Sequence, residues 1–260
     1  MTHAASSRST SAHADRLNKL RAALAAARID LLALIPGGSL RYMTGLSFHA
    51  GKRLSLTLIP SCDRPPVLVL PALEANSVEG KTPFPVKLET WTDADGPLAA
   101  LVQGLKKTDA MGEVTIGIEP AVMRVMELRA LEAAGATCGA TIRTVDAGEI
   151  IAGLRMVKSA DELHKMREAV RIIETALQRT IDRIRPGITE KELARHCTDE
   201  IMAAGGEGTS FESFVGAGAN SANPHHESGD RPLEAGDIII IDCGAVYQGY
   251  ASDITRTVAL

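Results

Sequence analysis

The sequence lacks an excess of basic charge and lacks any long apolar run. Lys and Arg number 28 against 32 Asp and Glu, and the formal net charge is −4. That balance argues against nucleic acid and against an anionic membrane surface as partners. No apolar stretch reaches the roughly 20 residues needed to span a bilayer. With 45% hydrophobic and 23% charged residues, the 260-residue chain has the composition of a soluble globular protein.

Cysteine is scarce and unpatterned. The four cysteines, at positions 62, 138, 197 and 243, form neither a CxxC pair nor a zinc-ribbon spacing. We therefore expect buried free thiols in a reducing compartment, which predicts a cytoplasmic protein. Residues 1–14 are small and polar and lack the apolar core of a secretory signal, so they are predicted to be a disordered tail. A transit peptide is the alternative reading of their Ser, Ala and Arg content.

Apolar strands alternate with helical stretches over residues 15–150. An amphipathic helix is expected at 15–28, because leucines recur there at helical spacing. The alternation predicts an α/β domain. The expected strands are 31–35, 54–59, 66–70, 86–90, 114–119 and 141–145, and the further helices are 73–78, 96–106 and 122–134.

The pattern changes over residues 151–260, where two helices precede antiparallel strands. Capping boxes at 159–162 and 189–192 predict the helix starts, and Pro186 and Gly205 mark where the helices end. A strand at 211–215 and a Gly/Asn/Ser-rich loop at 216–230 are expected to follow. Helices followed by strands predict a separate α+β domain.

A hairpin is predicted at the end of this second domain, and it carries two aspartates. The apolar run 238–241 indicates a strand buried on both faces, and Gln248-Gly249 is a plausible two-residue turn. With that turn, Asp242 faces Thr255, and Asp253 lies on the same face as Asp242, roughly 7–8 Å away at the backbone. Two carboxylates on one face predict a site for a divalent cation with oxygen ligands. The alternative is that each Asp is a solvent-facing or capping residue.

His225 lies in the polar loop that precedes this hairpin. Adjacent histidines in a loop, such as His225 and His226, are usually just solvated. Catalytic groups are often found on loops held by a rigid scaffold, which makes His225 a candidate catalytic residue.

Several motifs accompany these residues and share one resemblance. Together they resemble the pita-bread metallopeptidases, within them the Xaa-Pro aminopeptidase and Xaa-Pro dipeptidase (prolidase) branch, and the first half is similar to the creatinase-type N-terminal domain. The motifs are LRYMTG at 40–45, MVKSADEL at 156–163, RPGITE at 185–190, FESFVGAGANSANPHH at 211–226, LEAGD at 233–237, IDCGAVYQGY at 241–250 and SDITRT at 252–257.

The resemblance implies a fold, a site and an activity. It implies an α/β creatinase-like domain followed by an incomplete α+β pita-bread domain. It assigns Asp242 and Asp253 as metal ligands and His225 as the residue that contacts substrate, with two divalent ions as cofactors, Mn²⁺ before Co²⁺ or Zn²⁺. The implied reaction is hydrolysis of Xaa-Pro peptide bonds in a small peptide, by a homodimer. Thr255 and Arg256 are expected to orient the site.

The family's remaining ligands, one His and two Glu, follow the SDITRT motif at a distance, whereas this sequence ends at Leu260. We therefore expect the chain to be part of a longer protein. Two other functions stay open: a metal-dependent, lyase-type relative that is not a peptidase, and an inactive fragment that only dimerises. The metal-free creatinase branch fits less well, because both aspartates are present.

Overall fold

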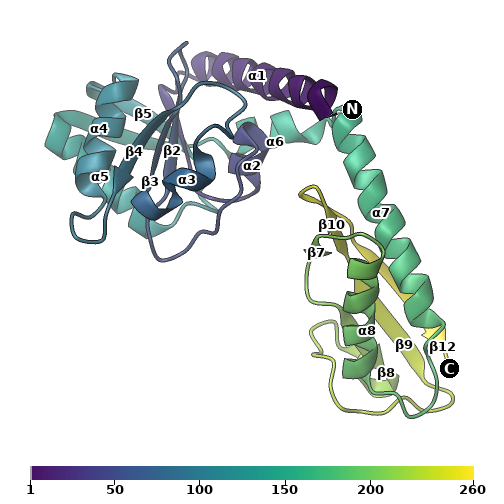
Figure 1. Ribbon diagram of the computed structural model, residues 1–260. Helices are drawn as coiled ribbons and strands as arrows, with labels where there is room; N and C mark the ends of the chain where they lie inside the picture. The colour runs from purple at the N-terminus through teal and green to yellow at the C-terminus, as the bar shows by residue number, and fades with distance from the viewer. Residues whose placement is uncertain (1) are drawn as a thin grey trace. The chain divides into compact units, whose positions relative to one another are not determined.

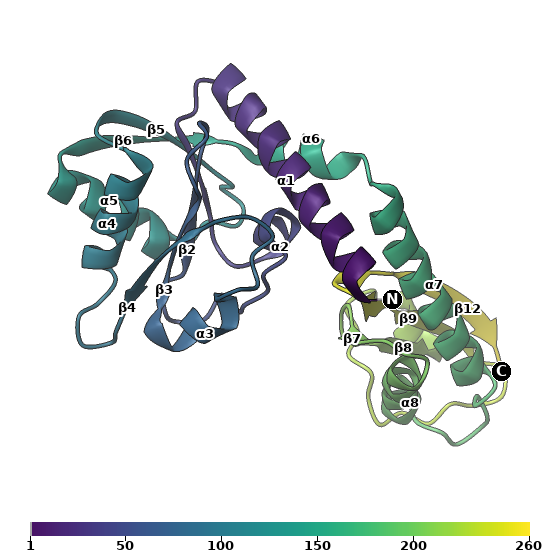
Figure 2. The same cartoon turned by 45° about the horizontal axis from the view of Figure 1, so that its top comes forward.

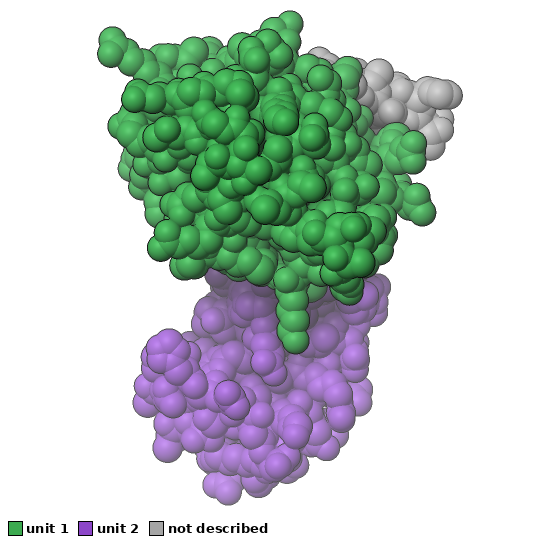
Figure 3. All heavy atoms as spheres, turned by 90° about the vertical axis from the view of Figure 1, so that its left-hand side faces the viewer, with its two compact units in different colours: residues 1–157 green, residues 158–260 purple. Residues whose placement is uncertain are grey.

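The computed structural model describes residues 2–260, with side chains from residue 12 onward. The chain divides into two compact units, residues 1–157 and residues 158–260, coloured separately in Figure 3. This division falls after Val157 rather than after residue 150, because Ile151 of helix α6 (Gly148–Met156) is buried in a core of unit 1. No helix in the described part of the chain is long and apolar enough to cross a membrane.

Unit 1 is built on a six-stranded mixed sheet with the strand order β4-β3-β2-β1-β5-β6. Neighbours β1–β2 and β2–β3 are antiparallel, and the other three pairs are parallel. The strands are β1 (Leu31–Leu34), β2 (Leu56–Pro60), β3 (Val67–Pro71), β4 (Lys87–Trp91), β5 (Gly112–Ile118) and β6 (Ala140–Asp146).

Helices cover both faces of this sheet (Figures 1 and 2). Strand β1 reads LLAL because alternate residues enter different cores: Leu31 packs with α4 and α5, and Leu32 packs with α1, α2 and α6. The helices are α1 (Thr2–Ala26), α2 (Gly38–Thr44), α3 (Ala75–Val78), α4 (Leu98–Thr108), α5 (Val125–Cys138) and α6, with the short 3₁₀ helix η1 (Ala72–Glu74) before α3.

Two features of unit 1 differ from the sequence prediction. Helix α1 is described from Thr2, so it includes residues 2–14, which the sequence predicted to be a disordered tail. Helices α2 and α6 were not predicted. Helix α2 starts at Gly38, the last residue of the Pro36-Gly37-Gly38 sequence after β1, and it ends at Thr44, with Gly45 as its C-cap at φ 73°.

Unit 2 begins with helices α7 (Ala160–Ile181) and α8 (Glu190–Ala203), and both predicted capping boxes are present. In the first, the backbone amide of Glu162 donates to the Ser159 hydroxyl at 3.3 Å, and the Ser159 amide donates to the Glu162 carboxylate at 2.9 Å. Thr189 and Glu192 repeat this arrangement at 3.2 and 3.0 Å. Each box satisfies amide groups that a helix start leaves without partners.

The strands of unit 2 form two small sheets, with the orders β11-β10-β7 and β12-β9-β8. Helices α7 and α8 share one core with the second sheet, where Val215, Ile239 and Ile241 are fully buried. The strands are β7 (Gly208–Thr209), β8 (Phe214–Ala217), β9 (Ile238–Cys243), β10 (Ala245–Tyr247), β11 (Tyr250–Ala251) and β12 (Ile254–Ala259), with the 3₁₀ helix η2 (Gly218–Ala222) after β8.

The predicted hairpin and its register are confirmed. Thr255 pairs with Asp242 and Tyr250 pairs with Tyr247, which leaves Gln248 and Gly249 as the two-residue turn. Both turn residues have positive φ, 46° and 78°, as a type I′ turn requires. The hairpin therefore fixes the side on which every residue of β9 and β12 projects.

The prediction that residues 238–241 are buried on both faces was wrong. Ile239 and Ile241 face the helices and are fully buried, whereas Ile238 is 48% exposed and Ile240 is half-buried. Helices α7 and α8 pack against the face that carries Ile239 and Ile241. Within the described residues, the opposite face, which carries Asp242, is the more open one.

Replacing Gly249 by alanine is expected to destabilise the hairpin by about 1 kcal/mol, since a side chain at this left-handed position is strained. Gln248→Asn should have no cost or a small gain, because Asn tolerates positive φ better. Native-state hydrogen exchange of the β9 and β12 amides measures both effects. Equal shifts in the two variants would contradict the turn assignment.

Candidate functional site

Asp242 is placed by strand β9 on the more open face of its sheet. The strand alternates buried and less buried residues, so Asp242 is half-buried while its neighbours Ile241 and Cys243 are buried. The Thr255 hydroxyl, directly opposite on β12, donates a hydrogen bond of 2.8 Å to Asp242 Oδ1. Thr255 therefore orients the carboxylate, as the resemblance implied. The Arg256 guanidinium instead donates to the Thr255 carbonyl at 2.9 Å.

Asp253 precedes β12 and is exposed. It is two residues before Thr255, so the alternation of an extended chain directs it to the same face as Thr255 and Asp242. The hydrogen bond with Cys197 and burial raise the pKa of the Cys243 thiol far above its usual range, and the negative charges of Asp242 and Asp253 add to the increase.

The donor chemistry of Asp242 and Asp253 fits a divalent cation with oxygen ligands. Thr255 donates to one oxygen of Asp242, and no hydrogen bond to the other oxygen is found within the described residues. Among the described residues, no group of three or more His, Cys, Asp or Glu gathers to hold a metal ion. By themselves the two aspartates do not make up a complete ligand set.

The cysteines do not contribute to this pair of acids. All four are free; Cys138, Cys197 and Cys243 are buried as predicted, whereas Cys62 is exposed, in the turn between β2 and β3. Cys243 points into the helix-covered core, opposite to Asp242. Its hydrogen bond with Cys197 lowers the pKa of the Cys197 thiol to about 7.

His225 lies in the segment between β8 and β9, and its side chain is exposed. Its backbone amide donates to Asn223 Oδ1 at 3.0 Å. Within the described residues, no hydrogen bond or ion pair joins His225 to Asp242 or Asp253. The segment that carries His225 follows strand β8, and Phe214, at the start of β8, pairs with Asp242 in the sheet.

Glu190 holds the loop that carries His225, and the sequence interpretation missed it. Its carboxylate is fully buried and has four donors: Ala217 N at 2.8 Å, Asn220 Nδ2 at 3.0 Å, His226 Nε2 at 2.7 Å and Gly229 N at 3.1 Å. Burial by itself raises the pKa of Glu190, but these four hydrogen bonds outweigh it and hold the pKa below the usual range. The second acid in the Thr189–Glu192 capping box was the signal, since the box needs only Glu192.

His226 was given no role by the sequence, yet it bridges two elements. Its ring packs at 82° to that of Phe214, with centroids 6.1 Å apart, while its Nε2 bonds to Glu190. An ion pair holds the loop just before β9: Arg231 binds Asp237 with two hydrogen bonds of 2.7 and 2.9 Å. Gly218, with φ 56°, lies against this ion pair, and a Cβ there would approach Asp237 Oδ1 to 2.7 Å.

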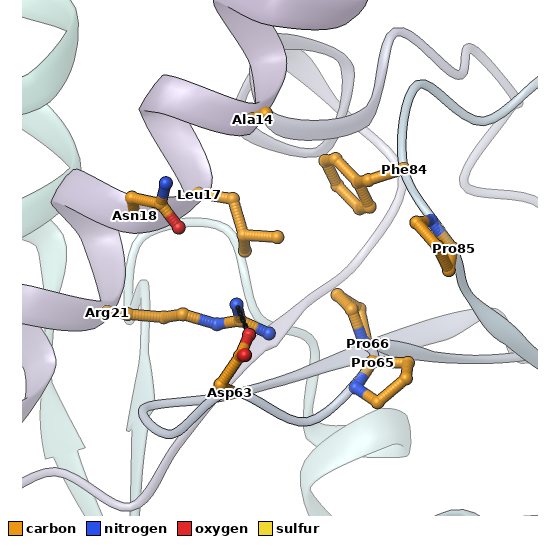
Figure 4. A pocket seen from close by; sticks show the side chains of 9 residues that line it. All are labelled: Ala14, Leu17, Asn18, Arg21, Asp63, Pro65, Pro66, Phe84 and Pro85. Carbon is orange, nitrogen blue, oxygen red and sulfur yellow. Dashed lines mark hydrogen bonds and ion pairs between the residues drawn. The ribbon is translucent and has the colours of Figure 1, made fainter.

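A pocket of about 240 Å³ lies elsewhere, in unit 1 (Figure 4). An ion pair between Arg21 and Asp63, at 2.8 Å, and the side chain of Asn18 form its polar part, and apolar side chains including Phe84 form the rest. None of the residues predicted for the site line this pocket.

Comparison with known proteins identifies the family to which these features belong. Residues 16–157 match the model of the creatinase/prolidase N-terminal domain, and residues 164–260 match that of metallopeptidase family M24. The chain belongs to the family defined by the creatinase/prolidase N-terminal domain, whose model covers more than half of it, and its second unit is similar to metallopeptidase family M24. The two matches correspond to units 1 and 2, so the predicted fold, a creatinase-like α/β domain followed by an incomplete pita-bread domain, is confirmed.

Relatives of this chain are described as dipeptidases and prolidases. A probable dipeptidase PepE of Mycobacterium tuberculosis is 32% identical over 251 residues. Among solved structures, a dipeptidase from Pyrococcus horikoshii is 32% identical with a TM-score of 0.82 and covers 94% of this chain, and a prolidase from Thermococcus sibiricus is 28% identical with a TM-score of 0.83. The chain spans 64% of the mycobacterial relative and 65% of each of these two structures.

Proposed function

We propose that this chain contributes the first part of a dinuclear metal site that hydrolyses Xaa-Pro peptide bonds. The observation that carries the proposal is the pairing and hydrogen bond of Thr255 with Asp242. Asp253 is two residues before Thr255, so the alternation of an extended chain directs it to the same face. Two divalent ions held there would polarise the peptide carbonyl and activate water for attack. Support for the peptide bond as substrate comes from the relatives, which are described as dipeptidases and prolidases.

The residues of this chain have distinct tasks in the proposed site. Asp242 and Asp253 provide carboxylate oxygens for the ions, and Thr255 fixes the orientation of the first. His225 contacts the substrate and donates a hydrogen bond to the oxygen on which negative charge develops. We propose that one further His and two Glu complete the ligand set, from the part of the relatives that this chain does not span.

Several finer points remain predictions of the family resemblance. They are Mn²⁺ as the metal, with Co²⁺ or Zn²⁺ as alternatives, a homodimer as the assembly, and the cytoplasm as the location. A lyase-type relative and an inactive, dimerising fragment are the competing functions. Both are compatible with the N-terminal domain, so the reaction itself must separate them.

Product analysis distinguishes these functions. We expect the gene's full product, supplied with Mn²⁺, to release free proline from a Xaa-Pro dipeptide and to leave the matching Xaa-Ala dipeptide largely intact. Proline release identifies hydrolysis, since a lyase would split its substrate without adding water. Equal cleavage of the two dipeptides, or no release of proline at any tested metal, would contradict the proposed function.

A further inference from the structure

A single buried carboxylate connects helix α8 to both ends of the loop that carries His225. Ala217 is the last residue of β8, and Gly229 lies past the histidines; their amides donate to the two different oxygens of Glu190. Asn220 and His226 lie between Ala217 and Gly229 in the chain, and each donates a side-chain hydrogen bond to Glu190. A buried anion with four donors from one loop restricts the conformations of that loop.

Helix α8 does not need Glu190 for its own start. Thr189 and Glu192 form the capping box, and the amides of Glu190 and Lys191 donate to the carbonyls of Arg231 and Gly229 at 3.1 and 3.0 Å. The hydrogen bonds described for the Glu190 carboxylate all go to the loop and none to its own helix. An apolar residue of similar size would fill the same space without burying a charge.

The contacts of Glu190 include His226, the residue next to His225. His226 is fixed on three sides: its Nε2 by Glu190 at 2.7 Å, its ring by the ring of Phe214, and its backbone amide by the Asn223 carbonyl at 3.1 Å. The His225 side chain is exposed. The direction of the His225 side chain is therefore set by its backbone, which the contacts of His226 hold in place.

We propose that Glu190 and His226 are positioning residues that fix the His225 loop for a substrate bound beside Asp242. The inference rests on the proposed function, because that function assigns His225 its contact with substrate. Phe214 connects the strand that carries Asp242 with the loop that carries His225, since it pairs with Asp242 in the sheet and packs against His226. Glu190 acts through His225 and does not itself touch the substrate.

The test compares Glu190→Gln with the matched control Glu192→Gln. Glu190→Gln keeps the size of the native side chain, but the new amide group places an N–H against loop donors where an oxygen had accepted. Glu192→Gln removes the same charge two residues away on the same helix, where the native carboxylate contacts only Thr189 among the hydrogen bonds described. His226→Ala and His226→Gln form a second pair, in which glutamine retains a donor for Glu190 and alanine does not.

Hydrogen exchange of the loop amides in the present chain measures directly whether Glu190 holds the loop. Glu190→Gln should speed exchange of the Ala217 and Gly229 amides by about 10–100-fold, the effect of losing a hydrogen bond to a charged group, and Glu192→Gln should leave them unchanged. Unchanged exchange in Glu190→Gln, or equal acceleration in both variants, would overturn the proposal. If Glu190→Gln does not fold, faster exchange at Gly229 in His226→Ala than in His226→Gln supports it, and no difference overturns it.

Steady-state kinetics of the gene's full product measure whether Glu190 and His226 position His225 for the reaction. Glu190→Gln should lower kcat by about 10–100-fold with little change in KM, and His226→Gln should retain more activity than His226→Ala. In a His225→Ala background, Glu190→Gln should cause no further loss, because its effect passes through His225. Additive losses would overturn the proposal. If the unsubstituted protein released no proline, the proposed function would fail, and the exchange comparison would still decide whether Glu190 holds the loop.

Discussion

Replacing Asp253 by asparagine is expected to lower kcat/KM for a Xaa-Pro dipeptide by on the order of 10³-fold or more in the gene's full product. Asparagine matches aspartate in size, so the hairpin should keep its register. The change removes the charge of a carboxylate two residues before Thr255, the residue that pairs with Asp242. Losing that charge should release metal, and metal analysis by mass spectrometry should find fewer ions per chain than in the unsubstituted protein.

Asp199→Asn is the matched control for this prediction. Asp199 also lies in unit 2, but it is on helix α8 rather than on the hairpin. The control should retain full metal content and activity. If Asp253→Asn kept two ions per chain, the assignment of Asp253 as a ligand would be wrong.

Replacing His225 by alanine is expected to lower kcat by about 10²–10³-fold, the usual cost of removing one donor to developing negative charge. Metal content should stay unchanged, because His225 makes no described contact with Asp242 or Asp253. The two large effects are therefore separable: Asp253→Asn loses metal and rate together, whereas His225→Ala loses rate alone. Steady-state kinetics and metal analysis on the same preparations measure this difference.

His164→Ala serves as the control for His225→Ala. His164 is exposed on helix α7, outside the His225 loop and the hairpin. It should match the unsubstituted protein in both measurements. Loss of metal in His225→Ala would show that His225 belongs to the ligand set rather than to the substrate contacts.

Local chemistry made the hairpin predictable from sequence. A two-residue turn containing Gly249 fixes the register of both arms, and the register fixes the face of every side chain, including Asp242. The capping boxes were equally readable, because a hydroxyl and a carboxylate three residues apart satisfy each other's backbone donors. These features depend on neighbours in the chain and need no knowledge of tertiary packing.

Features that depend on tertiary contacts were harder to predict. Helices α2 and α6 are short, and helix α6 is fixed by burial of Ile151 beside α1 rather than by a strong local signal. The apolar run from Ile238 indicated burial on both faces, but helices cover only the face that carries Ile239. An apolar run alone cannot distinguish one covered face from two.

The most informative miss is Glu190. In sequence it is one of two acids in a capping box, and helix chemistry explains only Glu192. Its four donors come from residues 27 to 39 positions later in the chain. No local pattern predicts such a set, although the surplus acid at a helix start was a visible clue.

Metal reconstitution of the gene's full product tests the central claim most directly. Protein stripped with a chelator would be titrated with Mn²⁺ while proline release from a Xaa-Pro dipeptide is followed, in parallel with Asp253→Asn. We predict that the stripped protein is inactive, that activity returns and saturates at two ions per chain, and that Asp253→Asn stays inactive throughout. Undiminished proline release by the stripped protein would contradict the account.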